Sequence, residues 1–165
     1  MALAKKLHLE FCRSVLILEH LELKVDIQAP AEQVWTAITA WEKQGQWMMA
    51  TKVTSLDGAG QHEGARIEAF TGIGKLGFLD TMTITSWNPP KSCSVLHTGK
   101  IVRGTGDFKV VPITDQSCTF IWAEDLVIPL GIIGKIGFLL VKPGFLWGIR
   151  RSLGKFANLV ELGQI

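Results

Sequence analysis

The amino-acid sequence predicts an α+β fold, in which a curved sheet of seven antiparallel strands wraps around one long C-terminal helix. Residues 144–162 have the apolar periodicity of an amphipathic helix, and the residues before them read mostly as strands joined by short turns. Strands with short connections pair antiparallel, and an amphipathic helix needs an apolar surface on which to lie. We therefore expect the helix to lie on the concave side of the sheet, with a cavity between them.

The first predicted strand covers residues 21–28 and follows an N-terminal extension, residues 1–18, that has no clean periodicity. Pro30 ends this strand and suits the first turn of a helix. We expect two short helices to follow, the first through Val34 and Ile38 and the second ending near Met49. The strand itself alternates between apolar and polar side chains, which is typical of a half-buried strand: Leu21, Leu23, Val25 and Ile27 against Glu22, Lys24, Asp26 and Gln28.

Six further strands are predicted between residues 51 and 128, each bounded by turn residues. Asn88-Pro89-Pro90 is a strong turn signal, and Pro129 closes the last strand. The expected strands are residues 51–57, 65–71, 78–87, 93–98, 104–113 and 117–128.

The predicted C-terminal helix begins just after Pro143 and ends before Gly163, because these residue types are typical of helix starts and stops. Its outer side includes the basic residues Arg150, Arg151 and Lys155. Its apolar side consists of Phe145, Ile149, Leu153, Phe156 and Val160.

Three ionisable residues fall on the apolar, inward-facing sides of predicted strands. Asp80 has the phase of Met82, Glu124 has the phase of Trp122, and His97 shares its phase with the apolar residues of its own strand. A lone charge at such a position costs several kcal/mol unless it is paired or meets water in a cavity. These residues can orient a polar group of a ligand, act as a general acid and base, or form a buried network that only satisfies itself.

Composition places the chain among globular proteins of one domain, residues 1–165, because 47% of the residues are hydrophobic and 19% are charged. A net charge of +2 with dispersed basic residues gives no indication of nucleic-acid binding. Cys12, Cys93 and Cys118 have no metal-ligand spacing, so we expect unreactive thiols in a reducing cytoplasm. No sequence motif indicates a metal or a cofactor, and we expect neither.

Two other segments have competing interpretations. Residues 72–77 match the pattern GxGxxG, but a strand is expected after them instead of a helix, so we interpret them as a flexible loop at the cavity mouth. The glycine-rich residues 131–141 resemble this loop and are expected to flank the same opening.

Membrane contact is also left open by the sequence. Residues 130–149 are the most apolar window, but Lys135 and Lys142 lie inside it, and each charge costs about 2.5–3.5 kcal/mol at bilayer depth, so we expect no spanning helix. The outer stripe Trp147, Arg151 and Lys155 indicates either weak peripheral contact with a membrane, contact with an acidic partner, or a solvated basic face.

The order of one strand, two small helices, six strands and a long helix resembles the START-like (Bet v 1-like, helix-grip) superfamily, and within it the polyketide cyclase/dehydrase group, SRPBCC. The resemblance extends from Leu21 to Gly163. The segments that show it are Ile27-Gln28-Ala29-Pro30, Trp87-Asn88-Pro89-Pro90, His97-Thr98-Gly99, Gly104-Thr105-Gly106-Asp107-Phe108, Trp122-Ala123-Glu124-Asp125-Leu126 and Pro129-Leu130-Gly131.

This resemblance implies a deep cavity that binds a hydrophobic small molecule such as a lipid, a polyketide or an aromatic metabolite. It also leaves open an enzyme of the aromatase/cyclase kind, and a regulator that recognises another protein. The residues that we expect to contact a ligand are Asp80, His97, Glu124, Trp35, Trp47, Met82, Phe108, Trp122, Ile149, Leu153 and Phe156, although aromatic and Met residues at these phases are as often plain core.

Overall fold

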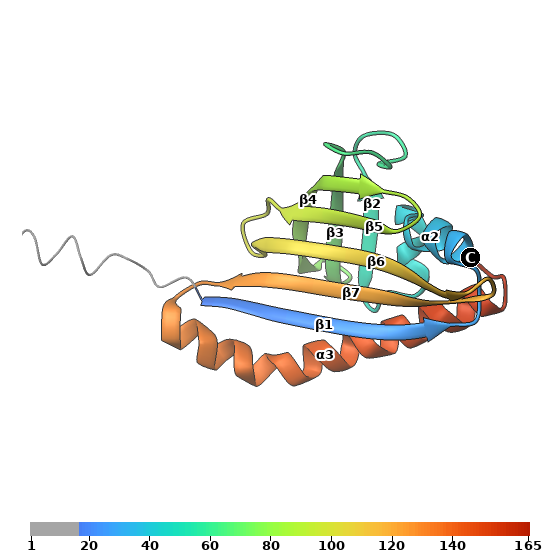
Figure 1. Cartoon of the computed structure of the whole chain (residues 1–165). Helices are drawn as coiled ribbons and strands as arrows, with labels where there is room; N and C mark the ends of the chain where they lie inside the picture. The colour runs from blue at the N-terminus through green and yellow to red at the C-terminus, as the bar shows by residue number, and fades with distance from the viewer. Residues whose placement is uncertain (1–16) are drawn as a thin grey trace, which may run out of the picture.

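The computed structural model describes residues 17–165 and shows one antiparallel sheet lying across a long C-terminal helix (Figure 1). The sheet has the strand order β1-β7-β6-β5-β4-β3-β2. Its strands are β1 (Ile17–Ile27), β2 (Thr51–Ser55), β3 (Arg66–Ile73), β4 (Leu76–Asn88), β5 (Ser92–His97), β6 (Gly104–Thr114) and β7 (Ser117–Ile128). The helical elements are α2 (Ala31–Ile38), the 3-10 helix η1 (Trp41–Gln46) and α3 (Gly131–Glu161).

The predicted fold class and all seven predicted strands are confirmed. Leu21, Leu23 and Ile27 of β1 are buried, whereas the intervening Glu22, Lys24 and Asp26 are exposed, as the alternation predicts. Because β1 begins at Ile17, the predicted extension lies almost wholly outside the described residues, as does Cys12.

The sheet is strongly curved. Figure 1 shows β2 and β3 standing at a steep angle to β1 and β7, so that the strands enclose a concave face. A register shift between Ile84 and Ser86 lies in β4, and a second lies between Pro112 and Thr114 in β6. Such irregularities bend a strand and increase its local twist, which helps a sheet to curl.

Helix α3 is longer than the sequence predicted. It begins at Gly131, and Pro143 lies inside it, so the predicted start just after Pro143 is wrong. The interpretation of residues 131–141 as a loop is wrong for the same reason. Pro143 resembles a first-turn proline, and the residues before it have no apolar stripe that faces the sheet, so periodicity gave no signal of the first turns.

Residues 72–77 also differ from their predicted loop. Gly72 and Gly77 pair across β3 and β4, and the connection is a tight turn at Gly74 and Lys75. Gly74 has a φ of 62°, a left-handed conformation that glycine adopts without a steric penalty. The strand expected after this segment is confirmed, but the segment is a paired hairpin and not a flexible loop.

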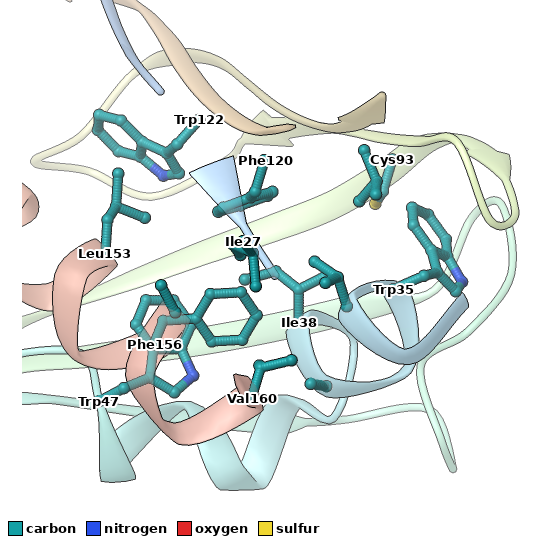
Figure 2. Packing of buried hydrophobic residues seen from close by; sticks show 14 of the residues in the cluster. Ile27, Trp35, Ile38, Trp47, Cys93, Phe120, Trp122, Leu153, Phe156 and Val160 are labelled. Carbon is teal, nitrogen blue, oxygen red and sulfur yellow. The ribbon is translucent and has the colours of Figure 1, made fainter. Parts of the chain in front are cut away.

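The C-terminal half of α3 is held by aromatic packing around Phe156, which is fully buried (Figure 2). Its ring centroid lies 4.9 Å from that of Trp47, in the link after η1, and 5.6 Å from that of Phe120 in β7. Leu153 and Val160 are buried on the same side of the helix. These contacts anchor the last three turns of α3 to the sheet and to the residues after η1.

Three hydrogen bonds add direction to this anchor. The Ser152 hydroxyl accepts a bond from the backbone N–H of Met49 at 3.0 Å and donates to the carbonyl of Gly148 at 2.9 Å. Near the end of the helix, the Gln33 side chain donates to the carbonyl of Val160 at 3.0 Å. The position of α3 over the sheet is therefore fixed by its C-terminal half.

We predict that Phe156→Ala lowers the free energy of unfolding by about 3–5 kcal/mol, because it removes a buried ring and leaves a cavity among Trp47 and Phe120. Urea denaturation followed by tryptophan fluorescence measures this. The control Asn158→Ala, at an exposed position of the same helix, should change it by less than about 0.5 kcal/mol. Equal effects of the two substitutions would contradict the anchoring role of Phe156.

Candidate functional site

A cavity of about 420 Å³ lies between the concave face of the sheet and the middle of α3. Its volume falls in the range of sites for small molecules. Met82, Phe108 and Trp122 line it from the sheet, and Phe145 and Ile149 line it from the helix. Most of the lining is apolar, so the cavity suits a molecule with a large apolar body.

Seven of the eleven predicted ligand-contact residues line this cavity, and four do not. The four others, Trp35, Trp47, Leu153 and Phe156, belong to the solid core beside it (Figure 2). The seven lining residues are Asp80, His97, Glu124, Met82, Phe108, Trp122 and Ile149.

The sequence analysis missed several lining residues. Phe78 has the same strand phase as Asp80, so its place in the wall was available from the alternation. Gly106 and Ser152 gave no such signal, because glycine and serine are not distinguished by an apolar pattern. The remaining wall includes Met48, Met49, Thr51, Val53, Ile67, Ala69, Thr71, Val95 and Leu126.

The three predicted ionisable residues meet in a single hydrogen-bonded cluster, the Asp80–His97–Glu124 triad. His97 stands at the end of β5, between Asp80 of β4 and Glu124 of β7. Its Nδ1 lies 2.7 Å from Oδ2 of Asp80, and its Nε2 lies 2.8 Å from Oε2 of Glu124. All three residues are buried, with exposed fractions between 7% and 9%. The triad therefore sits in the cavity wall, shielded from bulk solvent.

Gly106 makes room for the Glu124 carboxylate. The two residues pair across β6 and β7, and a Cβ atom at position 106 would lie 2.9 Å from Oε1 and 3.1 Å from Oε2 of Glu124. Any side chain at Gly106 would press on the carboxylate that bonds His97. The small residue thus belongs to the site although it has no polar side chain.

The pKa values of the triad are set by burial and by the hydrogen bonds together. Burial disfavours the imidazolium ion of His97, but the hydrogen bonds to Asp80 and Glu124 outweigh this effect and raise its pKa to about 9. Burial raises the pKa of the Glu124 carboxyl, and the hydrogen bond to His97 opposes this. The proton between Nε2 of His97 and Oε2 of Glu124 is thus held tightly by the pair.

The triad offers acceptors and no free cation. With one proton on the His97–Glu124 pair and another on Nδ1, the three side chains together hold one negative charge when Asp80 is ionised. Oδ1 of Asp80 is buried without a hydrogen-bond partner. Among residues 17–165, no Lys or Arg lines the cavity. A hydrogen-bond donor or a cationic group is the complement that this wall lacks.

Cys93 and Cys118 are free and buried, as expected of unreactive thiols. Burial raises the pKa of the Cys93 thiol to about 12 and also raises the pKa of Cys118. Cys93 lines the cavity, but a thiol with this pKa is a poor nucleophile near neutral pH. The cavity chemistry therefore rests on the triad.

Comparison with known proteins relates the chain to one family. A family model described as polyketide cyclase/dehydrase and lipid transport matches residues 19–161. A search among curated proteins gave no match.

Several solved structures share the fold. The Zhui aromatase/cyclase from Streptomyces sp. R1128 has a TM-score of 0.70 at 16% identity, covering 88% of this chain and 94% of that one. Norcoclaurine synthase from Thalictrum flavum, in complex with dopamine and hydroxybenzaldehyde, has a TM-score of 0.65 at 14% identity, covering 88% and 87%. A protein from Thermus thermophilus has a TM-score of 0.70 at 12% identity, covering 89% and 100%. At these identities the likeness shows the fold alone.

We predict that stability falls as the pH rises from about 6.5 to about 9. The raised pKa of His97 gives a stabilising contribution that is complete below its unfolded value near 6.5 and is lost as the pH passes the folded value of about 9. The raised pKa of Glu124 acts in the same direction. Thermal unfolding across this pH range should show a loss of up to ~3 kcal/mol for the wild type.

His97→Gln should flatten this pH dependence. The matched control is His20→Gln, because His20 forms an exposed pair with Asp125 and such pairs add little stability. The control should retain the slope of the wild type. A slope that survives in His97→Gln would show that the triad is not the titrating unit.

Proposed function

Because this chain belongs to the polyketide cyclase/dehydrase and lipid transport family, we propose that it binds an apolar small molecule in the cavity beneath α3. The ligand class is a lipid, a polyketide or an aromatic metabolite. The observation that supports this most directly is an apolar cavity of about 420 Å³ whose wall contains one buried polar cluster. A carrier or binding protein needs this combination, since the apolar wall holds the ligand body and the polar cluster orients it.

Most of the binding free energy comes from the apolar wall. Transfer of apolar surface from water contributes about 25 cal/mol per Å² before the entropic costs of binding are subtracted. Phe108, Trp122 and Ile149 present such surface from two opposite sides of the cavity. A flat or elongated apolar molecule fits between them.

The polar part of the ligand donates hydrogen bonds. Oδ1 of Asp80 has no partner, and the hydrogen bond from His97 to Glu124 uses only Oε2 of that carboxylate. A hydroxyl, phenol or protonated amine on the ligand would satisfy these acceptors. An anionic head group would meet the negative triad without any Lys or Arg to offset the repulsion.

A second candidate function is an enzyme of the aromatase/cyclase kind, which the His97–Glu124 hydrogen bond favours. A pair that holds one proton in a dry cavity can both take a proton from a substrate and return it. One related structure is described as an aromatase/cyclase and another as norcoclaurine synthase. Ring closure of this kind depends mostly on positioning, so the triad and the cavity shape suffice in principle.

We predict that the protein binds 2-naphthol about threefold to tenfold more tightly than 2-methoxynaphthalene. The two probes have the same apolar body, but only 2-naphthol can donate a hydrogen bond to the triad, and such a bond contributes about 0.5–1.5 kcal/mol. Quenching of tryptophan fluorescence measures both affinities. Asp80→Asn, which adds a donor at the triad, should reduce this preference.

Two glycines of α3 provide a matched pair of variants for the position of the site. Gly148 is buried and lines the cavity, whereas Gly154 is exposed and has open space around it. Gly148→Leu should weaken both probes by about tenfold, and Gly154→Leu should leave both affinities unchanged. Unchanged binding in Gly148→Leu would place the probes elsewhere, and no binding to the wild type would contradict the proposed function.

Native mass spectrometry of protein isolated from its own host separates the carrier from the enzyme. A retained apolar molecule that is released unchanged supports the carrier. Conversion of that molecule by the wild type, with loss of turnover but retention of binding in His97→Gln, supports the enzyme.

A further inference from the structure

The N-terminal half of α3 presents an apolar stripe to solvent, on the side that faces away from the sheet. Ile136 and Phe156 are twenty residues apart, which is about 200° around a helix, so the stripe lies opposite the buried anchor. In Figure 1 this half of the helix is orange, with β1 and β7 on one side of it and no described element on the other. The stripe consists of Ile132, Ile133, Ile136, Leu139, Leu140 and Trp147, with exposed fractions from 52% to 79%.

An exposed stripe of this kind is unusual for a protein that is monomeric in water. Single exposed apolar residues are common, but a contiguous row of large ones marks a surface that contacts a membrane, a partner or a ligand. By length and composition, α3 is apolar enough to cross a membrane, with a mean hydropathy of 1.5 over its most apolar 18 residues. None of that window is buried inside the protein.

The charges near the stripe are of one sign. Between Asp125 and Glu161 the chain has no acidic residue and five basic ones. Arg150 lies fourteen residues after Ile136, which places it about 40° away around the helix, so the basic residues continue the outward face. The Arg151 guanidinium lies 6.0 Å from the Trp147 ring, and Trp and Arg together are typical of the interface between lipid tails and head groups.

We propose that the outward face of α3, from Ile132 to Arg151, docks the protein on the surface of an anionic membrane. The apolar stripe enters the region below the head groups, and Arg150 and Arg151 contact lipid phosphates. This is the arrangement of a helix that lies in the interfacial plane. Docking does not require a ligand in the cavity, so it stands or falls separately from the proposed function.

Two other occupants fit the structure less well. A second copy of the chain would bring the same basic residues and no acidic ones to the contact, so charge complementarity would be absent. A membrane-spanning helix would have to take Lys135 and Lys142 into the hydrocarbon, and Lys142 already pairs with Glu19 of β1 at 3.1 Å. The C-terminal half of α3 is moreover fixed in the protein core.

Docking would place one wall of the cavity beside the lipid. Phe145 both lines the cavity and is 39% exposed, and it lies on α3 between the stripe residues Leu140 and Trp147. If the cavity takes a lipid or another membrane-soluble molecule, as proposed above, the ligand would enter without crossing bulk water.

The test is flotation of the full chain with vesicles of phosphatidylcholine alone or with added phosphatidylglycerol. The wild type should float with the anionic vesicles, should bind neutral vesicles less, and should be released by high salt or alkaline carbonate. The triple variant Ile133→Gln, Ile136→Gln, Leu140→Gln should lose about tenfold or more of its binding, because these exposed side chains would no longer enter the lipid. Arg150→Gln with Arg151→Gln should remove the preference for anionic vesicles.

The control is Val111→Gln with Ile113→Gln, two exposed apolar residues near the β6–β7 turn, at the opposite end of the sheet from the start of α3 (Figure 1). This variant should bind vesicles like the wild type. Circular dichroism checks that each variant keeps the wild-type fold. Three results would overturn the proposal: no flotation of the wild type, retention after carbonate extraction as for a spanning helix, or a dimer in solution that the triple variant abolishes.

Discussion

The packing of Phe156 between Trp47 and Phe120 is the contact on which the rest of this structure depends. It holds the C-terminal half of α3 against β7 and against the residues after η1. The middle of the helix then passes over the sheet without filling the space beneath it, because Gly144 and Gly148 face the cavity with no side chain. A helix that packed against the sheet along its whole length would leave no cavity. The hollow therefore follows from where the large side chains of α3 stop.

Buried charge is the second constraint, and it explains the arrangement of the polar groups. An isolated ionised side chain in an apolar wall is strongly disfavoured, so Asp80, His97 and Glu124 are found together and share protons. Gly106 leaves the space that Glu124 needs to reach His97. One acceptor, Oδ1 of Asp80, remains without a partner. This unsatisfied atom distinguishes the triad from a network that exists only for stability, and it gives the cavity a chemical preference.

Much of the fold was predictable from the sequence, because alternation of apolar and polar residues reports directly on sheet faces. The same rule placed Asp80, His97 and Glu124 on the inner face, and their hydrogen-bonded contact was then a matter of strand order. Alternation does not distinguish a side chain that borders a void from one that packs in solid core, which is why Trp35 and Leu153 were grouped with true cavity residues. Periodicity also could not reveal the first turns of α3, whose apolar residues face solvent and whose Pro143 resembles a helix start.

The two halves of α3 thus have different surroundings, one in the protein core and one in solvent, and the cavity lies near the point where they meet. The central claim is that this cavity accommodates an apolar molecule whose donor group faces the triad. A crystal structure of the protein soaked with 2-naphthol tests it most directly. The account predicts the naphthalene ring between Phe108 and Ile149, with its hydroxyl within hydrogen-bond distance of Asp80 or Glu124. A structure in which α3 has closed onto the sheet, with side chains filling the space and no ligand inside, would contradict it.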